Sequence, residues 1–162
     1  MARAGIEPGS FRDPDSRVLV SRDGVFRLLS EQGLADWRLL AASELFARAT
    51  QDGSLIGTTE SANGRELVAE LDATDPALAT LPAAVLRHDE IQFVSYPYEW
   101  TFGMLRDAAL LELDLLLAAL DEGLVLKDAT PYNVQWRGAR PVFIDVGSFE
   151  RLREGEPWVG YR

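Results

Sequence analysis

The chain has 162 residues, 47% of them apolar, which is enough for one domain with a hydrophobic core. Its formal net charge of −10 argues against nucleic acid or an anionic membrane as the main partner, because both attract basic surfaces. The absence of cysteine excludes disulfides and zinc–thiolate sites. The single histidine, His88, excludes a multi-histidine metal site, and we expect it to be an exposed turn residue.

The N-terminal part of the chain predicts short strands joined by tight turns. Residues 1–16 are rich in Gly, Pro and charge, which predicts a loose segment. Their polar character does not resemble a signal peptide, so we expect a cytoplasmic protein. Strands are expected over 17–21 and 25–29, because Asp23-Gly24 between them is a strong hairpin signal.

The middle of the chain predicts two further hairpins. Strands are expected over 54–60 and 65–71, around Asn63-Gly64, and the proline-containing stretch 72–82 is expected to be a loop. The second hairpin pairs the segments 84–87 and 91–96. It is interrupted by the aromatic sequence SYPYEW, residues 95–100.

The spacing of apolar residues predicts two helices. The first runs over 34–50, with Gly53 after its end, and the second over 101–122, with Gly123 as its stop. The second helix is apolar nearly all round, which predicts a buried helix with one flank left for further helices or a downstream domain. Glu112 and Asp114 interrupt its most apolar part, so it does not predict a membrane span.

The stretch 123–149 predicts a short strand, a polar loop and a hairpin turning at Gly138. Its strands are expected over 124–126, 134–136 and 141–144. Polar residues stand at the strand ends: Asp128, Asn133 and Asp145. Such a set predicts oxygen ligands that converge on a hard cation bridging phosphates. The alternative is a turn rich in Asp, Thr, Pro and Asn that only caps two strands.

The spacing of these three residues resembles protein-kinase-like phosphotransferases, including the aminoglycoside-kinase-like branch. Asp128 to Asn133 matches their D-x-x-x-x-N loop, and Asp145-Val146-Gly147 matches their D-x-G. The resemblance implies Mg²⁺ and ATP as cofactors. It implies that Asp128 is the catalytic base or orienting carboxylate, and that Asn133 and Asp145 are magnesium ligands.

The same resemblance assigns roles nearer the N-terminus. Arg27 stands in the strand where kinases carry a phosphate-binding lysine, and no glycine-rich G-x-G-x-x-G loop precedes it. Its partner on the following helix would be Glu44, or less favourably Glu31. The alternative is that Arg27 and Glu44 form only an ordinary surface ion pair with no role in binding phosphate. Tyr96 and Tyr98 would lie at the hinge that meets an adenine edge, or else cap a strand end with their polar tips in water.

A second resemblance covers more of the chain. The sequences SYPYEW and LKDATPYNVQWRGARPVFIDVGSFE are similar to an N-terminal module of bacterial proteins labelled class I S-adenosylmethionine-dependent methyltransferases, sometimes nodulation-related. In those proteins the methyltransferase domain lies downstream. The resemblance implies that S-adenosylmethionine is bound only through such a domain, either downstream or separate.

Together these observations predict an α+β, kinase-like fold with a truncated C-lobe, since a whole kinase-like domain needs roughly 250 residues. We expect a loose segment at 1–16, an N-lobe-like sheet and helix at 17–96, and a partial C-lobe at 97–162. One functional hypothesis is a nucleotide- and Mg²⁺-binding phosphotransferase with an unknown small-molecule acceptor. The other is a degenerate accessory domain of a methyltransferase, in a binding or regulatory role. The missing glycine loop and lysine favour the second, and the D…N…D set favours the first.

Overall fold

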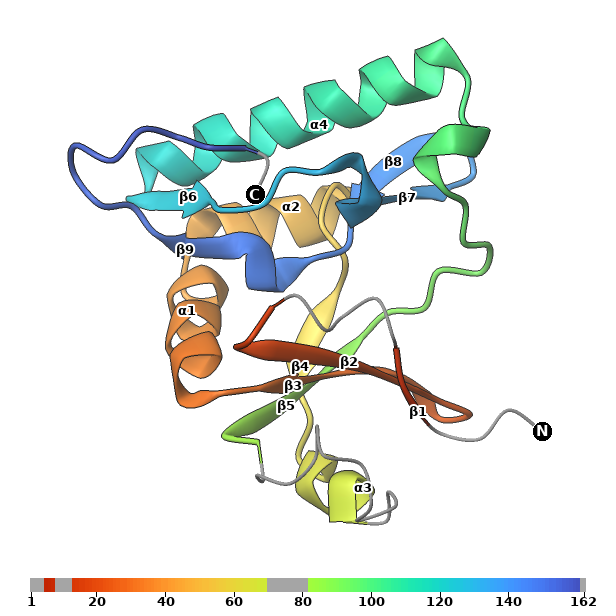
Figure 1. Ribbon diagram of the computed structural model, residues 1–162, viewed down its shortest axis with the longest axis vertical. Helices are drawn as coiled ribbons and strands as arrows, with labels where there is room; N and C mark the ends of the chain where they lie inside the picture. Colours follow the sequence, from red (N-terminus) through yellow and green to blue (C-terminus); the bar gives the residue numbers. More distant parts are fainter. Residues whose placement is uncertain (1–4, 8–12, 70–81, 161–162) are drawn as a thin grey trace. The chain divides into compact units, whose positions relative to one another are not determined.

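The computed structural model describes residues 5–7, 13–69 and 82–160. It has an α+β architecture with two compact units that interleave along the chain (Figure 1). The first unit comprises residues 1–35 and 58–90, and the second comprises 36–57 and 91–162. Among the described helices, none is long and apolar enough to cross a membrane.

The first unit is built on an antiparallel sheet with the strand order β1-β2-β3-β5-β4 (Figure 1). The predicted hairpin at Asp23-Gly24 is confirmed, because β2 and β3 pair in register with Val20 opposite Val25. The prediction of a loose N-terminal segment is wrong at Gly5–Ile6. This short strand pairs with β2, with Ile6 opposite Leu19, and so occupies the open edge of β2. The strands are β1 Gly5–Ile6, β2 Ser16–Ser21, β3 Gly24–Leu29, β4 Thr58–Glu60 and β5 Ala84–His88.

The predicted strand over 65–71 is wrong, because a helix, α3 Gly64–Ala69, begins where a hairpin turn was expected. The start of the helix lies against β5: a Cβ added to Gly64 would come within 2.3 Å of the Cβ of Val85. Val68 joins the buried cluster of the sheet, so core packing replaces strand pairing here. Residues 70 and 71, and the predicted loop apart from Pro82, lie outside the described residues.

The single helix predicted over 34–50 is two helices, α1 Glu31–Ala41 and α2 Glu44–Asp52. The break has a local cause and a distant one. The Ser43 hydroxyl accepts a hydrogen bond from the Phe46 N–H at 3.0 Å, which makes Ser43 the N-cap of α2. The Glu122 carboxylate, at the end of the long helix, accepts from the N–H groups of Glu44 and Leu45 at 2.8 and 2.6 Å. The predicted stop at Gly53 is confirmed, with φ of +83°.

The segment 91–96 is irregular and does not pair with β5, contrary to the expected hairpin. Both edges of β5 are already taken by β3 and β4. The strand expected over 54–60 also shortens to β4, because Ser54 and Ile56 exchange backbone hydrogen bonds with Phe143 instead. A 3₁₀ turn, η3 Pro97–Glu99, then leads into the long helix.

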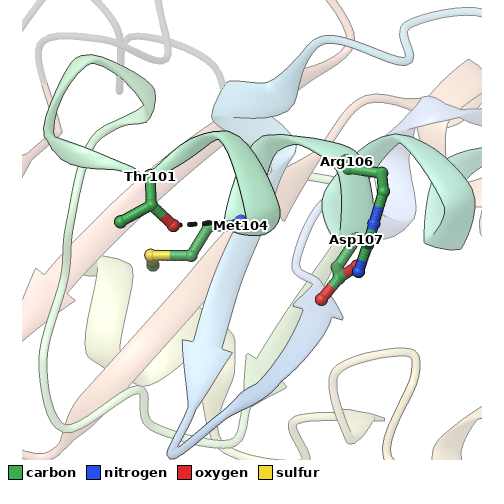
Figure 2. Close-up of polar contacts among 4 residues, drawn as sticks. All are labelled: Thr101, Met104, Arg106 and Asp107. Carbon is green, nitrogen blue, oxygen red and sulfur yellow. Dashed lines mark hydrogen bonds and ion pairs between the residues drawn. The ribbon is translucent and has the colours of Figure 1, made fainter.

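The long helix α4, Phe102–Asp121, is confirmed with its stop, since Gly123 has φ of +72°. Thr101 caps its start, where the hydroxyl accepts from the Met104 N–H at 3.3 Å (Figure 2). The helix is not buried on most sides, because only one face packs against the rest of its unit. That face consists of Ala108, Glu112, Leu115, Leu116 and Ala119.

Two small antiparallel sheets lie along the packed face of α4 (Figure 1). The predicted hairpin around Gly138 is confirmed as β7 Val134–Arg137 and β8 Arg140–Phe143. The predicted strand β6 Leu124–Leu126 pairs with β9 Phe149–Arg151. Phe143 and Phe149 are fully buried and meet edge to face, with ring centroids 5.8 Å apart. These contacts fix the loop between β6 and β7 beside the end of β8.

Candidate functional site

The loop that carries Asp128 folds back on itself between β6 and β7. The Asp128 carboxylate accepts a hydrogen bond from the Thr130 N–H at 3.1 Å, which forms a local turn. A 3₁₀ turn, η4 Pro131–Asn133, follows and is closed by the Asn133 N–H donating to the Thr130 carbonyl at 2.9 Å. The loop therefore presents Asp128 and Asn133 from opposite ends of one short, hydrogen-bonded segment.

A buried serine hydroxyl links the predicted metal ligands. Ser148 is 1% exposed, and its hydroxyl donates to the Asp145 carboxylate at 2.8 Å. The Asn133 amide group donates to the same hydroxyl at 3.4 Å and to the Asp128 carbonyl oxygen at 3.2 Å. The structure thus joins the Asn133 amide and the Asp145 carboxylate through one hydroxyl. The same amide also bonds to the backbone carbonyl of Asp128. Sequence analysis did not single out Ser148, although it lies three residues after Asp145.

The second oxygen of the Asp145 carboxylate accepts from the Gly147 N–H at 3.1 Å. Among the described residues there is no group of three or more His, Cys, Asp or Glu side chains placed to hold a metal ion. The predicted ligand set of Asp128, Asn133 and Asp145 differs from such a group, because it contains an amide and only two carboxylates. Mg²⁺ commonly keeps several waters or phosphate oxygens and takes only one or two carboxylates from the protein. Asn133 and Asp145 fit that mode of binding.

Glu112 is a candidate site residue that sequence analysis treated only as an interruption of an apolar run. It lies on the packed face of α4, is 8% exposed, and its Oε1 atom has no hydrogen-bond partner among the described groups. Burial, and then the nearby charge of Asp128, raise the pKa of Glu112 to about 7. The sequence signal was an acid placed among residues that helical periodicity assigns to a core-facing side.

The raised pKa of Glu112 predicts a pH-dependent stability. The folded protein holds this proton more tightly than an unfolded chain, whose ordinary pKa is 4.5, so stability falls as the pH rises from 4.5 to about 7. We expect Glu112→Gln to be more stable than wild type by about 2 kcal/mol near pH 8, allowing for some solvent screening, and nearly equal to it near pH 5. Urea unfolding at both pH values measures the difference. An equal gain at both pH values would contradict a charge-based cause.

Arg27 is buried in the sheet of the first unit, with 8% of its surface exposed. Its guanidinium donates to the Ser16 hydroxyl at 2.7 Å and to His88 Nε2 at 3.4 Å. The prediction that His88 is exposed is wrong: His88 is 7% exposed, and its Nδ1 lies 2.8 Å from the Thr58 hydroxyl. The reason is strand register, since His88 lies opposite both Val25 and Thr58 inside the sheet.

The predicted carboxylate partners of Arg27 are both at helix starts. Glu31 is the first residue of α1, and Glu44 is the first residue of α2. Glu44 belongs to the second unit, whereas Arg27 belongs to the first. The pairing of Arg27 with Glu44 therefore stays a prediction.

Tyr96 and Tyr98 form an exposed aromatic pair. Their rings stack at 5.4 Å between centroids with 7° between planes, and 45% and 75% of their surfaces are exposed. The Tyr96 N–H donates to the Glu99 carboxylate at 2.7 Å, which fixes the turn between them. Such a pair can stack on a flat ligand, but their role in binding adenine stays a prediction.

The C-terminal tail returns to the loop that carries Asp128. The Trp158 indole N–H donates to the Leu126 carbonyl at 2.8 Å, and the Ala129 N–H donates to the Gly160 carbonyl at 2.9 Å. Trp158 is therefore held against β6, while Tyr161 lies outside the described residues. Between the tail and β6 lies a hollow of about 100 Å³, partly lined by Lys127.

Comparison with known proteins shows that the chain is similar to part of a longer bacterial protein. No family model matches the chain. The nodulation protein NoeA of Rhizobium meliloti (strain 1021) is 34% identical to it over 164 residues, which cover 99% of this chain. The chain spans only 31% of the length of that relative. The similarity to a nodulation protein is thus confirmed, while the kinase-like fold and its site stay predictions.

Proposed function

We propose that this chain is a kinase-like accessory module that acts within or beside a longer protein and binds a Mg²⁺–nucleotide complex without transferring phosphate. The similarity to NoeA, a nodulation protein about three times as long as the match, supports an accessory role. The resemblance of the sequence to modules that precede methyltransferase domains supports a methyltransferase as the partner. S-adenosylmethionine would then be bound by that partner.

The observation that carries the proposal is the hydrogen-bonded chain from Asn133 through Ser148 to Asp145. It fixes an amide and a carboxylate side by side, at the two positions where the D-x-x-x-x-N and D-x-G motifs require magnesium ligands. Because Ser148 is buried, its hydrogen bonds with Asn133 and Asp145 are shielded from competing water. The protein oxygens of Asn133 and Asp145 would hold the cation, and phosphate oxygens would complete its coordination.

The small first unit argues for binding without catalysis. In an active kinase-like enzyme a strand cation reaches the phosphates, and a glycine-rich loop covers them. Here Arg27 occupies that strand position, yet it is buried and donates to Ser16 and His88. Releasing the guanidinium from these partners would leave buried polar groups unsatisfied, at a cost of about 1–3 kcal/mol for each group. An accessory role, regulated by the bound nucleotide, fits these residues better than phosphotransfer.

Phosphotransfer to a small-molecule acceptor is the second candidate, and the pair of Asp128 and Glu112 favours it. Asp128 would orient the acceptor hydroxyl, and the neighbouring Glu112, with a pKa of about 7, could share the proton that the hydroxyl releases. The described residues do not indicate which small molecule would be the acceptor.

Ligand-induced thermal shift separates these alternatives. We expect Mg²⁺–ATP to raise the melting temperature of the chain, S-adenosylmethionine to leave it unchanged, and no ATP to be consumed during prolonged incubation. A non-hydrolysable ATP analogue should give the same shift as ATP. A shift with S-adenosylmethionine alone would contradict the proposal. Hydrolysis or transfer of the γ-phosphate, lost in Asp128→Asn, would replace it by the second candidate.

A further inference from the structure

The outer face of α4 is an unusual apolar surface. Four leucines follow one another at spacings of three, four and three residues. Each of them is 37–61% exposed. We call this set the leucine stripe: Leu110, Leu113, Leu117 and Leu120. Phe102, in the first turn, is 83% exposed on the same side, and Arg106, seven residues before Leu113, separates it from the stripe. At 1.5 Å per residue the leucine stripe extends over about 15 Å. Monomeric proteins seldom leave a continuous apolar surface of this kind open.

The spacing of the leucine stripe is that of a seam between two helices. Apolar residues alternating at three and four residues place their side chains along one line of a helix, where a second helix packs knobs into holes. The face opposite the stripe is already packed in its own unit, through Ala108, Leu115 and Ala119. The core of the unit is thus packed from the other face, and the partly exposed stripe has the spacing that suits an external helix.

A row of acids along one edge of the stripe specifies the charge of that helix. Asp107, Asp114 and Asp121 stand seven residues apart, so they lie on one line beside the leucines. Asp107 is paired with Arg106 at 2.7 Å near the start of the helix (Figure 2). No basic side chain of α4 flanks Asp114 or Asp121 in this way. The acid row complements a helix with Lys or Arg at seven-residue intervals.

A second copy of the chain does not meet this requirement. In an antiparallel pair of α4 helices the two acid rows would face each other. In a parallel pair the acid row would face the opposite edge of the stripe, which holds Phe102, Ala109 and Leu116 and no basic residue. The net charge of −10 on each copy adds to the repulsion.

We propose that the leucine stripe and its acid row form a docking site for an amphipathic helix of a partner protein, with apolar residues at seam spacing and basic residues along one edge. The helix lies along α4, its apolar residues between the leucines and its basic residues beside Asp114 and Asp121. This proposal is independent of nucleotide binding at Asn133 and Asp145.

Two synthetic helices of about 20 residues test the docking site. They share leucine at the seam positions and differ only in the flanking row, which is lysine in one and glutamate in the other. We expect the lysine helix to bind at least about tenfold more tightly by fluorescence anisotropy. The double variant Asp114→Lys/Asp121→Lys should reverse the preference. Leu113→Ser/Leu117→Ser should abolish binding of both helices.

The controls separate docking from misfolding and from nonspecific charge effects. The substituted residues are exposed, so each variant should keep the wild-type circular dichroism spectrum and melting temperature. Glu154→Lys, in the exposed tail, should leave the preference unchanged. Equal binding of both helices, or no binding of either, would overturn the proposal. A wild-type dimer by sedimentation that Leu113→Ser/Leu117→Ser disrupts would assign the stripe to a second copy and overturn it too.

Discussion

Replacing Gln135 by leucine is expected to destabilise the second unit by about 3 kcal/mol, because it leaves two buried backbone groups unsatisfied. The Gln135 side chain is 5% exposed and bonds the backbone of Ser95 twice, accepting from its N–H and donating to its carbonyl, both at 3.0 Å. Leucine fills a similar volume but offers neither hydrogen bond. The Ser95 hydroxyl also accepts from the Trp100 indole at 2.9 Å, so the loss should reach the turn that carries Tyr96 and Tyr98.

Thermal unfolding measures this effect as a fall in melting temperature of roughly 10 °C. The near-ultraviolet circular dichroism of Trp100 should weaken at temperatures where the far-ultraviolet spectrum is still native. Gln51→Leu is the matched control, since Gln51 is exposed on α2 of the same unit, and it should change the melting temperature little. A Gln135→Leu protein as stable as this control would mean that Ser95 finds other hydrogen-bond partners.

Asp145→Asn is expected to abolish the stabilisation by Mg²⁺ that we predict for the wild type. At a Mg²⁺ concentration about tenfold above its dissociation constant, binding to the folded state alone adds about 1.4 kcal/mol. For a chain of this size that gain corresponds to roughly 3–6 °C in melting temperature. Asparagine keeps one oxygen to accept from the Gly147 N–H, replaces the oxygen that accepts from the buried Ser148 hydroxyl by an amide nitrogen, and removes the charge that attracts the cation. The lost acceptor for Ser148 can also lower the metal-free melting temperature, so the Mg²⁺ shift of each protein is measured against its own metal-free value.

Two further variants make this test specific to the site. Asp128→Asn should retain most of the Mg²⁺ shift, because Asp128 is predicted to orient an acceptor and not to bind the metal directly. Glu154→Gln removes one exposed carboxylate elsewhere and should retain all of it. Melting curves with and without millimolar Mg²⁺, each with and without ATP, give the comparison. A wild type that does not respond to Mg²⁺ in either condition would show that the motif residues only stabilise the loop.

The elements that sequence predicted correctly are those specified by neighbouring residues. Asp23-Gly24 and Gly138 supply the backbone conformations that tight hairpins need, and both hairpins form. Thr101 and Gly123 mark the two ends of α4 by capping chemistry alone. Asp128 and Asn133 likewise lie in the expected loop between β6 and β7, and Asp145 follows β8 as expected.

The elements predicted wrongly depend on partners far along the chain. The segment 65–69 is helical because Val68 packs on the sheet, and 91–96 does not pair with β5 because β3 and β4 already occupy both edges of that strand. The same holds for His88, which strand register buries beside Thr58. A periodicity of a few residues cannot report such contacts, because they depend on which edges and faces the folded chain leaves open.

By itself the sequence determined the turns, the helix ends and the order of the motif residues, because each depends on the conformational preferences of adjacent residues. Only the tertiary structure placed Ser148 between Asn133 and Asp145, buried Glu112 beside Asp128 and left one face of α4 open. The physical reason is the same in each case. Burial, hydrogen-bond satisfaction and charge proximity are properties of groups that meet through space, and residues distant in sequence supply those groups.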